Sequence, residues 1–128
     1  MLTRILTLIS LTLAIGSTSY ANQVICDGSY AVYRFRAQGF LNSNDTRIRG
    51  NVNVTVTGAG QTRNVVLTVK SSDVKPQSHI RATGTMKDGS GSVEATYDAG
   101  SQSYRGVLHG QDSERTYNVN VTCGIYQN

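Results

Sequence analysis

The feature of this sequence that most constrains its fold is an alternation of apolar and polar residues with a period of two. Runs rich in Val, Thr and Tyr alternate in this way and are separated by Gly, Asn, Asp and Ser. Successive side chains of a β-strand point to opposite faces, so this pattern is typical of half-buried strands. The runs span residues 30–41, 47–57, 62–71, 79–87, 92–99, 103–110 and 115–123, and residues 23–26 are a candidate eighth strand. No helical periodicity follows residue 21, which predicts an all-β protein.

Short turns between the runs predict antiparallel hairpins, in which facing residues must point to the same side of the sheet. Turns at 42–45, 58–61, 88–91, 100–101 and 111–114 pair Phe35 with Val52, Val54 with Val65, Met86 with Val93, Tyr97 with Tyr104 and Leu108 with Tyr117. All five hairpins agree on one apolar face, and a one-residue slip in any of them would invert its pattern. The remaining connection, 72–78, holds Pro76, the only proline, and is predicted to be a loop.

A sheet with one apolar face must bury that face by closing on itself or by folding over. The sequence therefore predicts an antiparallel up-and-down meander of seven to eight strands that closes as a small barrel, with a β-sandwich as the alternative. An even number of strands would let residues 23–26 pair with the last strand. Glycines at 39, 50, 84 and 106 fall on the same predicted face, where they permit the bending that closure needs.

The start of the chain predicts export. A basic start, an apolar run over 5–15 and small residues at Ser19 and Ala21 indicate a signal peptide over residues 1–21. The apolar run is too short for a stable membrane span, and no cysteine at the cleavage point offers a lipid anchor. Residues 22–128 are then one β domain, secreted or periplasmic.

Two cysteines, Cys26 and Cys123, lie near the two ends of the predicted domain. In an oxidising compartment they are expected to form one disulfide. Closing so long a loop would stabilise the fold by about 4 kcal/mol through restriction of the unfolded chain. Two isolated cysteines lack the paired spacing of a zinc site, so no metal is expected there.

Charge and composition argue against several classes of partner. The chain has 12 Lys and Arg against 8 Asp and Glu, and loss of Arg4 with the signal peptide would leave 11 against 8, a net charge of +3. Binding of single-stranded nucleic acid usually needs a denser basic surface with aromatic side chains between the basic ones. We therefore expect no nucleic-acid partner.

Candidate catalytic groups are sparse. His79 and His109 are predicted at opposite ends of the sheet, about 25 Å apart, so they cannot share a site. One end gathers His109, Asp88, Asp112 and Glu114, the best acid–base or metal cluster available. We interpret these side chains as ordinary solvated turn residues. No enzymatic activity and no cofactor are therefore expected.

Three hypotheses of function follow. The leading one is a non-enzymatic binding module that contacts an anionic polymer or acidic protein through the outward side chains of Arg34, Arg36, Arg47 and Arg49. The first alternative is a small-ligand carrier whose interior is lined by Tyr33, Tyr97, Tyr104 and Tyr117, all on the predicted inner face. Analogy with other small exported barrels adds a second alternative, an inhibitor of an extracellular enzyme.

Overall fold

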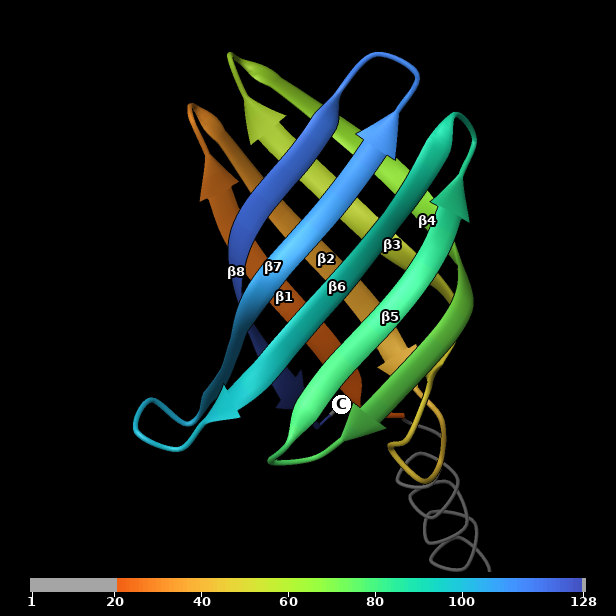
Figure 1. Ribbon diagram of the computed structural model, residues 1–128, viewed down its shortest axis with the longest axis vertical. Helices are drawn as coiled ribbons and strands as arrows, with labels where there is room; N and C mark the ends of the chain where they lie inside the picture. Colours follow the sequence, from red (N-terminus) through yellow and green to blue (C-terminus); the bar gives the residue numbers. More distant parts are fainter. Residues whose placement is uncertain (1–20, 128) are drawn as a thin grey trace, which may run out of the picture.

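A computed structural model describes residues 21–127 and confirms the predicted all-β barrel (Figure 1). Each strand pairs antiparallel with the next, and the last pairs with the first, so the sheet closes. The strands are β1 Gln23–Tyr30, β2 Tyr33–Leu41, β3 Ile48–Gly58, β4 Gln61–Lys75, β5 His79–Met86, β6 Gly89–Asp98, β7 Ser103–Asp112 and β8 Thr116–Tyr126. The predicted signal peptide, apart from Ala21, lies outside the described residues. Within residues 21–127, no helix is long and apolar enough to cross a membrane.

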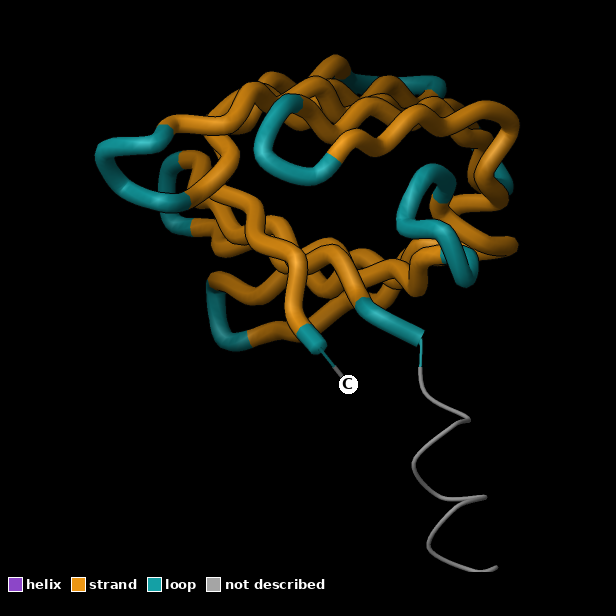
Figure 2. Tube along the Cα trace, turned by 90° about the horizontal axis from the view of Figure 1, so that it is seen from below, coloured by secondary structure: helices purple, strands orange, loops and turns teal. Residues whose placement is uncertain are grey.

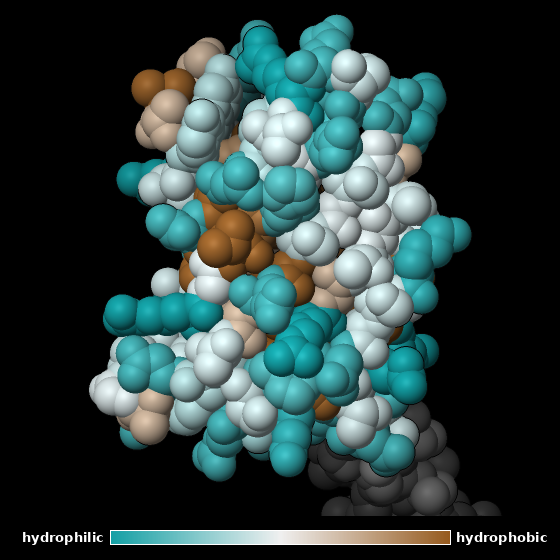
Figure 3. Space-filling view, in the orientation of Figure 1, coloured by the Kyte–Doolittle hydropathy of each residue, from teal (hydrophilic) through white to brown (hydrophobic). Residues whose placement is uncertain are grey.

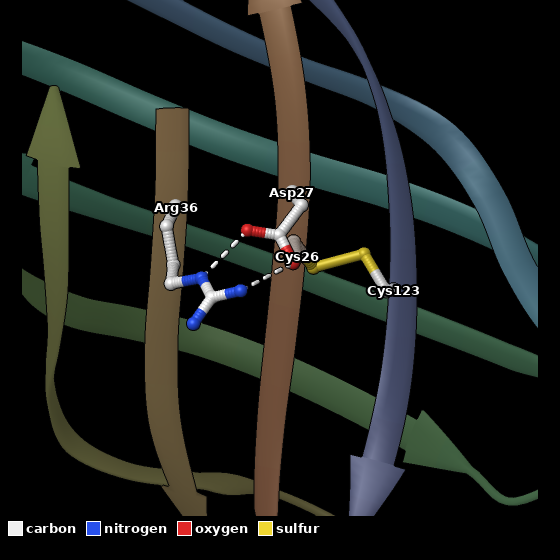
Figure 4. The surroundings of a disulfide bond; sticks show 4 residues. All are labelled: Cys26, Asp27, Arg36 and Cys123. Atoms are coloured by element: carbon white, nitrogen blue, oxygen red, sulfur yellow. Dashed lines mark hydrogen bonds and ion pairs between the residues drawn. A yellow bond between two sulfur atoms is a disulfide. The ribbon is translucent and has the colours of Figure 1, made fainter. Parts of the chain in front are cut away.

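The seam between β1 and β8 carries the predicted disulfide. Cys26 lies directly opposite Cys123 in the β1–β8 register, and their sulfur atoms are bonded (Figure 4). Both residues are buried, at 3% and 2% exposure. The bond therefore joins the first and last strands at the place where the meander closes.

The two ends of the barrel differ. One end, which we name the closed end, carries the loops 42–47, 76–78 and 99–102 together with both ends of the described chain, at the bottom of Figure 1. Leu41 and Ile80 are fully buried near it, at 0% exposure. The opposite end, which we name the mouth, carries the turns 31–32, 59–60, 87–88 and 113–115. Figure 2 looks at the barrel from the closed end and shows the strands as a flattened, closed ring.

The predicted inner face is confirmed, although three of the five predicted hairpin registers are wrong. The structure keeps Val54 opposite Val65 and Tyr97 opposite Tyr104. In the other three hairpins Phe35 faces Val56 instead of Val52, Met86 faces Gly89 instead of Val93, and Leu108 faces Val119 instead of Tyr117. Each shift is an even number of residues, so the side chains of these three hairpins stay on their predicted side except beside a bulge.

Two bulges interrupt the two-residue alternation, which by itself predicts neither of them. The β4–β5 register shifts between Val69 and Ser71, which leaves Lys70 as the extra residue. Beyond this bulge β4 continues to Lys75, and Val74 is buried at 2% exposure, so the prediction of a loop over 72–78 is wrong except for its last turn. In β3, Gly50 is exposed with φ at +60° beside the β2–β3 register shift, so it is not on the inner face.

Candidate ligand-binding cavity

The barrel contains a cavity of about 640 Å³ that opens at the mouth. It extends from the turn residues of the mouth down to Val24 and Cys26. Its walls are apolar side chains on the inward rows of the strands, which are only partly buried because they face the cavity and not one another. They are Phe35, Val52, Val56, Val65, Leu67, Val69, Ala82, Val93 and Leu108. The face seen in Figure 3 is mostly teal to white, with one apolar area near its middle and a smaller one at its upper left.

Several residues of the cavity lining carry little or no side chain. Gly84, Gly91 and Gly110 line it on β5, β6 and β7, and Ala82 adds a fourth small position. A Cβ atom built at Gly110 would find no heavy atom closer than the Tyr117 ring, at 3.8 Å, among those outside its immediate chain neighbours. Eight-stranded barrels have interiors just wide enough to be filled by side chains or to hold one small ligand. The open space beside Gly110 shows that side chains leave this interior partly unfilled.

Charged side chains surround the mouth. Arg63, Lys87 and Arg115 line the cavity there, together with Asp88 and Asp112. They come from the ends of β4 and β7 and from the two turns 87–88 and 113–115. Charged residues of both signs therefore surround the entrance of the cavity.

The Asp112 carboxylate is committed to its own turn. Its Oδ1 accepts hydrogen bonds from the backbone N–H groups of Glu114, at 2.8 Å, and Arg115, at 2.6 Å. These bonds lower the pKa of Asp112, and the charges of Arg115 and Arg63 lower it further. Asp112 is therefore ionised at neutral pH, and half of its acceptor capacity is used by the turn.

The four predicted interior tyrosines are divided between the two ends of the barrel. Tyr33 and Tyr117 line the cavity near the mouth. Tyr97 and Tyr104 pack edge to face at the closed end, with ring centroids 5.0 Å apart. The backbone N–H of Gln77 donates to the Tyr104 hydroxyl at 2.6 Å, so this tyrosine is satisfied within the fold. Only the mouth pair is placed to meet a ligand in the cavity.

The four arginines of the predicted outer surface are exposed, but they form two pairs instead of one cluster. Arg49 lies opposite Phe40, four residues along β2 from Arg36, a separation of about 13 Å. Arg36 forms a two-point ion pair with Asp27, at 2.7 and 3.2 Å, which neutralises it and raises its pKa (Figure 4). Arg34 and Arg47 form no ion pair with another described residue.

The predicted acid–base end is not assembled. His109, like Asp88 and Asp112, is a lining residue of the cavity. Its position on β7 is outward, however, and its Nδ1 is 2.5 Å from the Asn118 side-chain oxygen. Residues 21–127 contain no group of three or more His, Cys, Asp or Glu side chains that could hold a metal.

The structure shows one hydrogen-bonded chain that sequence reasoning missed. His79 Nδ1 is 3.0 Å from the Ser78 hydroxyl, and its Nε2 is 2.9 Å from the Asp73 carboxylate. The sequence signal for this hydrogen-bonded chain was a serine directly before a histidine. An aspartate lies six residues before the histidine, on the neighbouring strand. Ser78 lines neither the barrel cavity nor the cleft at the closed end, so the chain of bonds has no substrate space beside it. We interpret it as fixing the β4–β5 turn.

Fold and cavity together define a closed eight-stranded β-barrel with an apolar interior cavity that opens at one end. Comparisons of this chain with family models, with curated proteins and with solved structures found no match. Its function is therefore argued from its own geometry.

Proposed function

We propose that this protein acts outside the cytoplasm as a non-enzymatic binding protein that holds a small, largely apolar molecule inside the barrel. The observation that carries the proposal is the cavity of about 640 Å³ with its apolar walls. Small-molecule sites are usually apolar cavities of about 300–1,000 Å³ with a few polar groups that set orientation. A ligand that buries about 300 Å² of apolar area would gain about 7 kcal/mol before the cost of association.

Location outside the cytoplasm is supported by two features. Disulfides persist in oxidising compartments, and Cys26–Cys123 fits the periplasm or the extracellular space. Cleavage of the predicted signal peptide after Ala21 would leave Asn22 as the first residue. Asn22 is held at the closed end, where its side-chain amide donates to both Asp45 carboxylate oxygens at 3.0 and 3.2 Å. The proposed mature chain thus begins at an anchored residue.

The experiment is a titration of residues 22–128 with a neutral, environment-sensitive dye such as Nile red. Wild-type protein should bind it in a saturable, one-to-one manner. Gly110→Phe should abolish binding, because the new ring enters open space in the cavity, and it should not lower stability, because a glycine in a strand gives way to a β-favouring residue.

Val107→Phe is the matched control, because Val107 lies on the same strand but is 41% exposed on the outer face. It should bind the dye like wild type. Equal dye binding by the Gly110→Phe variant and wild type would show that the ligand is not held in the cavity.

The outer arginines are a second candidate site, favoured by the exposure of Arg34, Arg47 and Arg49 without an ion pair to any described residue. This surface would bind an anionic polymer or an acidic protein. Replacing these three and Arg36 by Ser should then advance elution from a polyanion column. Unchanged retention would remove this surface as a binding site. The alternative of an enzyme inhibitor stays a prediction.

A further inference from the structure

The cavity has a chemical asymmetry between its walls and its entrance, and this asymmetry indicates a class of ligand. The inference rests on the proposed function, because it assumes that the cavity is the binding site. Below the mouth most of the lining residues are apolar, whereas the mouth carries three cationic residues, Arg63, Lys87 and Arg115. A ligand that fits both parts must have an apolar body and a polar end.

Arg63 is the mouth cation that lies on an inward row of a strand, whereas Lys87 and Arg115 lie in turns. It occupies the inward row of β4 that continues with Val65 and Leu67, and it pairs with the inward residue Val56 of β3. Arg63 therefore lies at the mouth end of this apolar row, and it is one of the lining residues of the cavity. Its charge also reaches across the mouth, since it helps to lower the pKa of Asp112 on β7. Arg63 thus lies where the end of a bound molecule would emerge.

The mouth cations have spare capacity for an anion. Among the described residues, Arg63, Lys87 and Arg115 form no ion pair within 4.0 Å. Two acidic residues, Asp88 and Asp112, line the same mouth. Asp112 Oδ1 already accepts two hydrogen bonds from the backbone of its own turn. A guanidinium presents a planar fork of donors that matches carboxylate, sulfate and phosphate oxygens. Low-dielectric walls beside it strengthen such a contact.

The depth of the cavity suits a single chain of moderate length. Six residue steps on β1 separate Val24, at the base of the lining, from Tyr30, at the mouth. At about 3.3 Å per step and a strand tilt of about 40°, they correspond to a depth of about 15 Å. We infer that the barrel binds amphiphiles with one apolar chain and an anionic head, the chain lying in the cavity and the head at Arg63.

The test compares ligands of one chain length with different heads. Decanoate, decyl sulfate, decyl phosphate, decanol and decyltrimethylammonium would be titrated below their aggregation limits by calorimetry or by displacement of the neutral dye. We expect at least one anionic ligand to bind wild type tenfold or more tightly than decanol, and the cation to bind most weakly. The order among the three anions identifies the head-group chemistry. The anionic advantage should shrink as salt is added.

Arg63→Gln should reduce the preference for the anion over decanol to less than threefold. Arg34→Gln is the matched control, because Arg34 lies at a similar height on β2, opposite Thr57, but faces outward. It should keep the full preference. Far-ultraviolet circular dichroism would confirm that both variants are folded.

Different results would overturn the head-group inference and the proposed function. Equal wild-type affinity for decanol and every anionic ligand, or an anionic preference that survives Arg63→Gln, would overturn the head-group inference and leave the apolar carrier standing. Failure of both the dye and decanol to bind would overturn the proposed function itself.

Discussion

Removal of the disulfide gives the most quantitative prediction, because the bond closes almost the whole domain. Cys26 and Cys123 are 97 residues apart in the sequence. In the chain-entropy relation, a cross-link that closes a loop of this length stabilises the fold by about 4.7 kcal/mol. Small domains have a total unfolding free energy of about 5–15 kcal/mol. Reduction should therefore leave a barrel that is folded only marginally, because the β1–β8 backbone pairing remains.

The assay is urea unfolding of residues 22–128, oxidised and fully reduced, followed by far-ultraviolet circular dichroism. With a slope of about 2 kcal/mol per molar urea, the midpoint should fall by about 2 M on reduction. The same residues are present in both samples, so the comparison isolates the cross-link from any loss of packing. Cys26→Ala combined with Cys123→Ala should behave like the reduced protein. Midpoints within 0.5 M of each other would refute the reasoning that the bond acts by restricting the unfolded chain.

Three further changes test other parts of the structure. Gly106→Ala should destabilise by about 2 kcal/mol or more in the same urea assay, because an added Cβ would overlap the Glu94 carbonyl oxygen on β6. Val74→Ala should cost about 2 kcal/mol, since this side chain is 2% exposed, whereas a position in an exposed loop would cost almost nothing. Asp98→Asn should be less stable than wild type at neutral pH, because the Gly100 N–H and Ser101 hydroxyl lower the pKa of Asp98 below its ordinary 3.8. That gap should be present above pH 4 and close as the pH falls through the folded-state pKa, so unchanged curves would contradict it.

The two-residue alternation was sufficient to predict the fold but not the pairing within it. Alternation specifies which side of the sheet a residue faces, and a register shift of two or four residues leaves that side unchanged. This is why Phe35 was placed on the correct face and opposite the wrong partner. The turn geometry that selects among even registers depends on contacts absent from the alternation. For example, the Asp112 carboxylate accepts a hydrogen bond from the Arg115 N–H and so stabilises the β7–β8 turn. The register of this hairpin differs by two residues from the predicted one.

Glycine was the main source of error along β6. Gly89 and Gly91 have turn chemistry by composition, so residues 88–91 were predicted to be a turn. In the structure both glycines belong to strand β6. Glycine suits these positions because a Cβ at Gly89 would overlap the Gln111 carbonyl oxygen and one at Gly91 would press on Leu67. These requirements come from neighbouring strands, so a local pattern cannot reveal them.

The candidate site was predictable in part. The inward direction of Tyr33 and Tyr117 follows from alternation, but their separation from Tyr97 and Tyr104 depends on which strand ends meet at the mouth. Arg63 was overlooked even though it shares the odd-numbered row of Val65, so that row carried the missing signal. The cavity itself depends on the summed volumes of side chains from many strands. No single run of sequence reports that sum.

The structure separates the source of its stability from its proposed site. Leu41 and Ile80 near the closed end are fully buried, while many of the apolar side chains that line the cavity stay partly exposed. Hollow interiors forgo packing energy, since unfilled walls lose contacts that a filled core would make. The disulfide offsets part of this loss, because it restricts the unfolded chain. It joins β1 and β8 at Cys26, which also lines the base of the cavity. A ligand that fills the cavity should therefore raise the unfolding free energy. In the reduced protein, this increase should exceed the small unfolding free energy that remains without the ligand.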